Sequence, residues 1–158
     1  MTPNYKLRRT FGNWATRLLR GGHVLTAAEH HILAQLVSQL PDELRVPVEA
    51  QFDSYNLVQR EVDQRALNFY RVKIGKRGAV TIAPLLKSKV EEAPLIRLSF
   101  SVSGESEPLH AVLTAVHGRA FCVSFSRAVP RDKAPSDYAI LKTTQAWQSN
   151  FNLNEVAA

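Results

Sequence analysis

The chain has 158 residues, of which 45% are hydrophobic and 22% are charged, with seven Gly and eight Pro. This length fits one domain with its own core, and the composition excludes collagen-like and low-complexity chains. Cys122 is the only cysteine, which excludes an internal disulfide and a zinc site built from several cysteines. No apolar run approaches the roughly 18 residues that cross a bilayer, and the N-terminus lacks the apolar segment of a secretory signal. We therefore expect a cytoplasmic protein without a membrane span.

The charge is unevenly distributed. Twenty Lys and Arg against fourteen Asp and Glu give a net charge of +6. Residues 1–22 and 71–89 contain several cations and no acid, whereas residues 42–63 are rich in acids. Such segregation favours an oppositely charged partner, either a nucleic acid or an acidic protein surface.

The first part of the chain has helical periodicity. Phe11, Trp14 and Leu18 share the spacing of one helix face, which predicts a first helix ending before residues 21–22, both Gly. Thr26 and Glu29 form the pattern of a capping box, which predicts the start of a second helix. Its apolar stripe ends at Pro41 and consists of Ile32, Leu33, Leu36, Val37 and Leu40.

A third helix is expected to begin around Pro47, because proline is favoured in the first turn, and to end around Asn56. Val48, Phe52 and Tyr55 fall near one face of this helix. They are its expected core positions.

The second part of the chain changes to the period of β-strands. Residues 57–62 and 67–74 are expected to pair across residues 63–65, and residues 96–102 alternate between apolar and polar side chains. Residues 110–116 and 119–126 predict a hairpin whose tight turn is His117-Gly118.

In the second strand of this hairpin, strict alternation predicts Phe121, Val123 and Phe125 on the core face. Residues 79–86 are expected to add a short edge strand after a turn at 75–78. Within the C-terminal segment, residues 138–141 are a candidate last strand and residues 143–151 a candidate short helix.

These elements predict an α+β fold in which N-terminal helices pack on one face of a C-terminal antiparallel sheet. We expect one domain over residues 1–158. It would be mainly helical in 1–56, mainly antiparallel strands in 57–129, and irregular in 130–158.

No motif typical of an enzyme is found. Residues 75–78 lack the spacing of a phosphate-binding loop, and adjacent His30 and His31 would point about 100° apart on a helix. Cys122 lies within a predicted strand, away from the features that activate a thiol. We therefore expect no catalysis, no cofactor and no metal.

Nucleic-acid binding is one of two functions that we consider. Cations on or beside the first predicted helix could neutralise phosphates, and Tyr70 lies between cations as a possible stacking platform. The candidate residues for this function are Arg8, Arg9, Arg17, Arg20 and Tyr70. No helix-turn-helix, RNP-like strand or zinc-finger spacing accompanies them.

The other function follows from a resemblance. The helical lead-in, the stretch 51–60, the strand 67–70 and the hairpin around residues 117–119 resemble small single-domain bacterial immunity proteins of polymorphic and contact-dependent toxin systems. The resemblance implies a non-enzymatic cytoplasmic protein that binds and neutralises a cognate toxin. Such proteins are often acidic, whereas this chain is basic.

Two sets of residues are candidates for the contact with a toxin. The first set is a basic cluster on a predicted strand and its turn, which consists of Arg71, Lys73, Lys76 and Arg77. The second set belongs to the acid-rich stretch and consists of Asp42, Glu43, Glu49 and Asp53.

Overall fold

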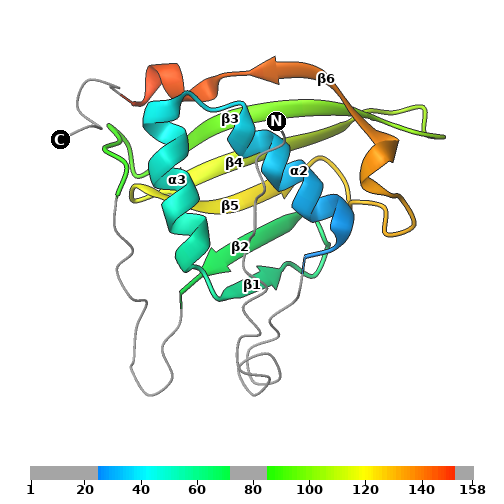
Figure 1. Ribbon diagram of the computed structural model, residues 1–158, viewed down its shortest axis with the longest axis horizontal. Helices are drawn as coiled ribbons and strands as arrows, with labels where there is room; N and C mark the ends of the chain where they lie inside the picture. The colour runs from blue at the N-terminus through cyan, green and yellow to red at the C-terminus, as the bar shows by residue number, and fades with distance from the viewer. Residues whose placement is uncertain (1–24, 72–84, 152–158) are drawn as a thin grey trace.

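The computed structural model describes residues 25–71 and 85–151 (Figure 1). Within these residues, two helices precede a sheet of six antiparallel strands, in the order β1-β2-β5-β4-β3-β6. Both helices lie across the same face of the sheet (Figure 1). This confirms the expected α+β arrangement. The elements are α2 (Ala27–Ser38), α3 (Asp42–Ser54), β1 (Leu57–Arg60), β2 (Ala66–Tyr70), β3 (Glu92–Val102), β4 (Leu109–Val116), β5 (Arg119–Phe125), η1 (Pro135–Asp137), β6 (Tyr138–Thr144) and η2 (Ala146–Ser149).

Helix α2 starts at the expected capping box. The Thr26 hydroxyl accepts a hydrogen bond from the Glu29 amide at 3.1 Å, and the Glu29 carboxylate accepts one from the Thr26 amide at 2.8 Å. Two backbone N–H groups that the helix leaves unpaired are thereby satisfied. The whole predicted apolar stripe is buried, which confirms the core face of this helix.

Helix α3 begins five residues earlier than the sequence predicted. Its first residue is Asp42, so Pro47 lies inside the helix and the prediction of a start at Pro47 was wrong. Leu44 is fully buried and extends the apolar face one turn upstream of Val48, which favours the longer helix. Pro47 lacks the N–H that would bond to the Glu43 carbonyl, but Glu43 is exposed, where water can replace that donor.

The predicted strand pairings are found in the described sheet. β1 pairs with β2 in the expected antiparallel hairpin, and β4 pairs with β5. His117 and Gly118 both have positive φ, 49° and 76°, as the tight turn of the β4–β5 hairpin requires. Gln64 has φ 60° and turns the chain between β1 and β2.

The core lies between the two helices and the sheet. From β3, Ile96, Leu98 and Phe100 are at most 1% exposed, in register with buried residues of β4. The ring of Phe52 in α3 packs edge-on against Phe69 of β2, with centroids 4.9 Å apart and an interplanar angle of 89°. The alternation predicted for residues 96–102 is therefore confirmed: its apolar residues face the helices.

A β-bulge moves Phe121 away from this core. Cys122 pairs with Thr114, but the next pair joins Ala120 to Ala115, so Phe121 has no partner in β4. Ala120 therefore joins Val123 on the helix-covered face, and the prediction that Phe121 lies there was wrong. An extra residue reverses the alternation on which that prediction rested.

The C-terminal segment is more regular than predicted. Strand β6 runs from Tyr138 to Thr144 and pairs with β3, and Tyr138 is buried. The predicted helix over residues 11–18 and the turn at 75–78 lie outside the described residues. The same is true of most of the edge strand predicted for 79–86, although Leu86 is described and is buried outside any strand.

The β4–β5 turn packs closely against α3 and residue 86. A side chain added at Gly118 in this turn should therefore destabilise the protein. The Gly118 carbonyl accepts hydrogen bonds from the Leu86 amide (2.8 Å) and from the Gln51 amide group (3.1 Å). A Cβ at Gly118 would lie 2.3 Å from the Leu86 carbonyl oxygen. At Gly104, which also has positive φ, the nearest atom to such a Cβ is the Lys133 ammonium nitrogen at 3.3 Å.

We predict that Gly104→Ala costs about 1 kcal/mol, because only the left-handed backbone penalises the side chain. Gly118→Ala should cost at least about 1 kcal/mol more, because backbone must also move. Chemical denaturation of both variants measures the difference. Equal costs would contradict the close packing of the turn against Leu86.

Replacing one phenylalanine on each face of the sheet tests which face the helices cover. Phe100→Ala should cost about 3–5 kcal/mol, because Phe100 is fully buried under the helices. Phe121→Ala should cost less than about 2 kcal/mol, because the bulge leaves its ring only partly buried. A cost for Phe121→Ala as large as that for Phe100→Ala in chemical denaturation would contradict the position of the bulge.

Candidate interaction surfaces

Helix α3 presents an acidic outer surface. Asp42, Val46, Glu49 and Asp53 recur at intervals of four, three and four residues, so they share the face opposite the buried one. Val46 is 60% exposed at the centre of this face, and Glu43 is exposed beside it. We call these five residues the α3 acidic surface.

One cation accompanies these acids on the helix. The Arg45 guanidinium pairs with the Asp42 carboxylate and lies 3.6 Å from a carboxylate oxygen of Glu49. Surface pairs of this kind contribute little to stability. The helix therefore carries four acids and one base, and its surface stays negative. All four acidic residues predicted as a partner contact lie together on this helix.

The predicted basic cluster is described only at its first residue. Arg71 directly follows β2 and is partly buried, whereas Lys73, Lys76 and Arg77 lie outside the described residues. Arg8, Arg9, Arg17 and Arg20 lie outside them too. The described residues contain twelve Lys and Arg against thirteen Asp and Glu. The positive charge of the chain is therefore carried by the rest of the sequence.

The face of the sheet opposite the helices, here called the open face, holds Tyr70. Its ring packs edge-on against Phe121, with centroids 5.1 Å apart and an interplanar angle of 86°. Burial raises the pKa of Tyr70, and the nearby Cys122 and Glu61 add to the shift. Of the two aromatic neighbours in β2, Phe69 is thus the core residue and Tyr70 lies on the open face.

A second group of polar residues on the open face was not singled out from the sequence. Ser99 of β3 pairs with His110 of β4 on one side and with Lys142 of β6 on the other. The Ser99 hydroxyl and His110 Nδ1 are hydrogen-bonded at 2.7 Å. Arg97 lies two residues before Ser99 on the same face, between buried neighbours. Alternation in β3 identifies Arg97 and Ser99, but sequence alone does not show which strands lie beside them.

The only cysteine is on the open face but is poorly suited to react. Burial raises the pKa of the Cys122 thiol from 9.0 to about 11, with smaller contributions from the negative charges of Glu61 and Glu92. A thiol with a raised pKa is rarely ionised at neutral pH. The raised pKa agrees with the sequence-based expectation that nothing near Cys122 activates its thiol.

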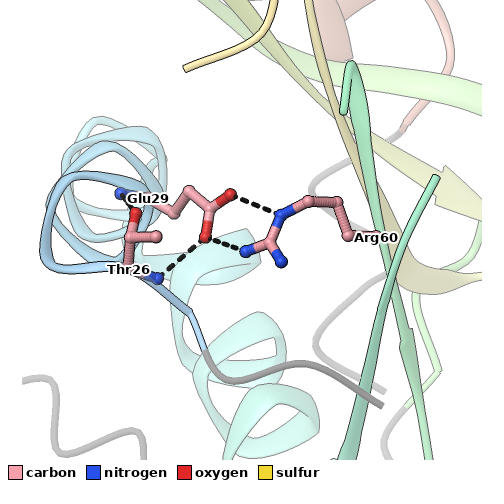
Figure 2. Close-up of polar contacts among 3 residues, drawn as sticks. All are labelled: Thr26, Glu29 and Arg60. Carbon is pink, nitrogen blue, oxygen red and sulfur yellow. Dashed lines mark hydrogen bonds and ion pairs between the residues drawn. The ribbon is translucent and has the colours of Figure 1, made fainter. Parts of the chain in front are cut away.

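A buried ion pair connects the helical layer to the edge of the sheet (Figure 2). The Arg60 guanidinium of β1 contacts both oxygens of the Glu29 carboxylate, with Nε 2.9 Å from Oε1. The two side chains are 8% and 5% exposed. The capping box predicted Glu29, but no sequence pattern predicts that Arg60, 31 residues later, is its partner.

Two further findings concern the described residues. None of their helices is both long enough and apolar enough to span a bilayer. Their His, Cys, Asp and Glu side chains form no group of three or more that is placed to hold a metal ion.

The ion pair and the cap can be separated by two variants. Glu29→Gln keeps a side chain that suits the capping box, but it leaves the buried Arg60 charge uncompensated, so it should cost about 3 kcal/mol. Thr26→Ala removes the cap alone and should cost about 1 kcal/mol. Urea denaturation measures both costs. If Glu29→Gln costs no more than Thr26→Ala, the buried pair is not a major constraint.

The shifted thiol predicts a pH dependence. The alkylation rate of Cys122 in the folded protein should rise until about pH 11, since the thiolate is the reactive form. The thiol ionises at a lower pH in the unfolded chain than in the folded protein. The neutral, buried thiol therefore contributes to the free energy of unfolding below pH 9.0, and this contribution is lost as the pH rises towards 11. Iodoacetamide labelling with mass spectrometry measures the profile. A midpoint near 9 in the folded protein would contradict the effect of burial.

Comparison with protein-family models finds no matching family, and comparisons with curated proteins and with solved structures find no match.

Proposed function

We propose that the chain is a non-enzymatic cytoplasmic binding protein, and that its partner is a bacterial toxin that it neutralises. The toxin is suggested by the resemblance of the sequence to immunity proteins. The α3 acidic surface is the observation that supports a protein contact, because it combines three exposed carboxylates and the half-buried one of Glu49 with the exposed apolar side chain of Val46. A partly apolar centre surrounded by charges is typical of protein interfaces.

The α3 acidic surface is preferred to the basic cluster as the contact. Its backbone is held by Leu44, Val48 and Phe52, each at most 1% exposed, so the carboxylates start from a fixed geometry. A preformed surface loses little entropy on binding. The expected partner surface is basic, as on a nuclease toxin. Inhibition would be steric and electrostatic: the helix covers the basic active site and speeds encounter by long-range attraction.

Nucleic-acid binding remains the second candidate, and one observation favours it. Tyr70 and Phe121 form an aromatic pair on the open face, where partly exposed rings offer surfaces for stacking bases. The cations first suggested for this function lie outside the described residues.

Charge reversal on α3 tests the first candidate. Glu49→Lys with Asp53→Lys should abolish the protection of cells that express the cognate toxin, because like charges would then face each other. The measurement is cell survival, together with a thermal melt of the variant. The melt should be nearly unchanged, since exposed charges contribute little to stability.

The matched control reverses two exposed acids elsewhere, Glu107→Lys with Asp132→Lys, and should leave protection intact. A third variant, Arg71→Glu with Arg77→Glu, reverses the basic cluster. Full protection by a folded α3 variant, with loss of protection in the Arg71/Arg77 variant, would move the contact to the basic cluster. Full protection by all three variants would exclude both surfaces.

A further inference from the structure

Three neighbouring strands bring basic and hydroxyl side chains together on the open face. His110, Ser99 and Lys142 lie side by side in one row across β4, β3 and β6. Arg97 lies one row further along, opposite Thr144, so it is the diagonal neighbour of Lys142. Diagonal neighbours in a sheet are about 7–8 Å apart at Cα, so two long cationic side chains can reach the same group. We call Arg97, Ser99, His110 and Lys142 the cationic row.

The cations of this row are not neutralised within the described residues. Arg97 and Lys142 are exposed, and neither forms an ion pair with a described carboxylate. Among the twelve described Lys and Arg residues, only Arg45, Arg60 and Arg127 form ion pairs. The cationic row is therefore set apart by the closeness of its members and not by the lack of a pair. Arg and Lys held at fixed positions on a sheet, beside the hydrogen-bonded pair of Ser99 and His110, provide donors for an anion.

The opposite end of the open face has a different chemistry. There, Tyr70 and Phe121 form the aromatic pair, and Glu61 and Glu92 are close enough to act on the ionisation of Cys122. The open face therefore carries Arg97 and Lys142 at one end and the aromatic pair with two acids at the other, where Arg119 lies in the row of Val116 and Glu92. Tyr70 of β2 lies three strand spacings from Arg97 of β3, or roughly 14 Å across the sheet. Glu92 belongs to β3 itself and is separated from Arg97 along the strand, five residues earlier.

From this arrangement we infer that the cationic row binds the phosphodiester backbone of a single-stranded nucleic acid, with its bases directed towards Tyr70 and Phe121. Phosphates would lie over Arg97 and Lys142, away from Glu61 and Glu92. Unpaired bases, which bear no charge, suit the aromatic end, where carboxylates would repel phosphates. A duplex fits less well, because its bases are already stacked and cannot lie on the rings.

The inference deepens the second candidate function and names residues of its binding site. It does not depend on the toxin, because the cationic row and the α3 acidic surface lie on opposite sides of the sheet (Figure 1 shows the side covered by α3). The two sites can therefore be tested separately.

The experiment measures binding of the full chain to fluorescent oligouridine and oligothymidine of about 12 nucleotides by anisotropy, over a series of salt concentrations. Arg97→Ala with Lys142→Ala should weaken binding about tenfold or more at low salt. It should also reduce the slope of log affinity against log salt by about 0.7 for each phosphate that is no longer neutralised. The matched control, Arg131→Ala with Lys133→Ala, removes the same charge from the loop after β5 and should keep the slope. Thermal melts confirm that both variants are folded.

Each outcome decides the inference. Equal weakening in the two double variants would show that net charge alone drives binding, which overturns the cationic row but leaves nucleic-acid binding standing. Equal affinity for a duplex of the same sequence would overturn the preference for single strands. No binding of the unmodified chain at low salt would overturn both the inference and the second candidate function.

Discussion

The buried ion pair between Glu29 and Arg60 constrains the position of helix α2 on the sheet. The carboxylate receives the guanidinium of β1 and the backbone N–H of Thr26, so its charge is compensated from two elements at once (Figure 2). An uncompensated charge in this place would cost several kcal/mol. A shift of α2 along the sheet would break the ion pair and leave the Arg60 guanidinium or the Glu29 carboxylate without its partner. The pair thus joins α2 to the edge strand β1.

Hydrogen bonds between uncharged groups hold α3 against the β4–β5 turn. The Gln51 side chain donates to the Gly118 carbonyl and accepts from the Ala120 amide, as a neighbouring strand would. The Tyr55 hydroxyl donates to the Ala120 carbonyl, and burial raises its pKa to about 12, which keeps it a donor. With both helices fixed on one face, α3 turns its acids outward and the opposite face keeps its own polar and aromatic groups. The two candidate functions follow from these two separate surfaces.

Local patterns predicted most of the fold. The capping box of Thr26 and Glu29, the alternation of 96–102 and the turn at His117-Gly118 each have a physical cause within a few residues, and all three are found. The errors arise where distant contacts decide. A bulge moves Phe121 to the open face, and burial of Leu44 brings Pro47 inside a helix. The acidic residues of α3 were predicted as a candidate contact from the charge distribution of the sequence alone. The cationic row was not, because only the β3–β6 pairing brings Lys142 beside Ser99.

Binding of a partner at the open face requires that solvent reach this face in the full chain. Hydroxyl-radical footprinting with mass spectrometry measures this directly, because oxidation of aromatic rings follows their exposure. Tyr70 and Phe121 should be oxidised much faster than Phe69 and Phe100, which are at most 1% exposed beneath the helices. Equal protection of all four rings in the folded protein would contradict the account. It would show that the open face is covered and is not free to bind a partner.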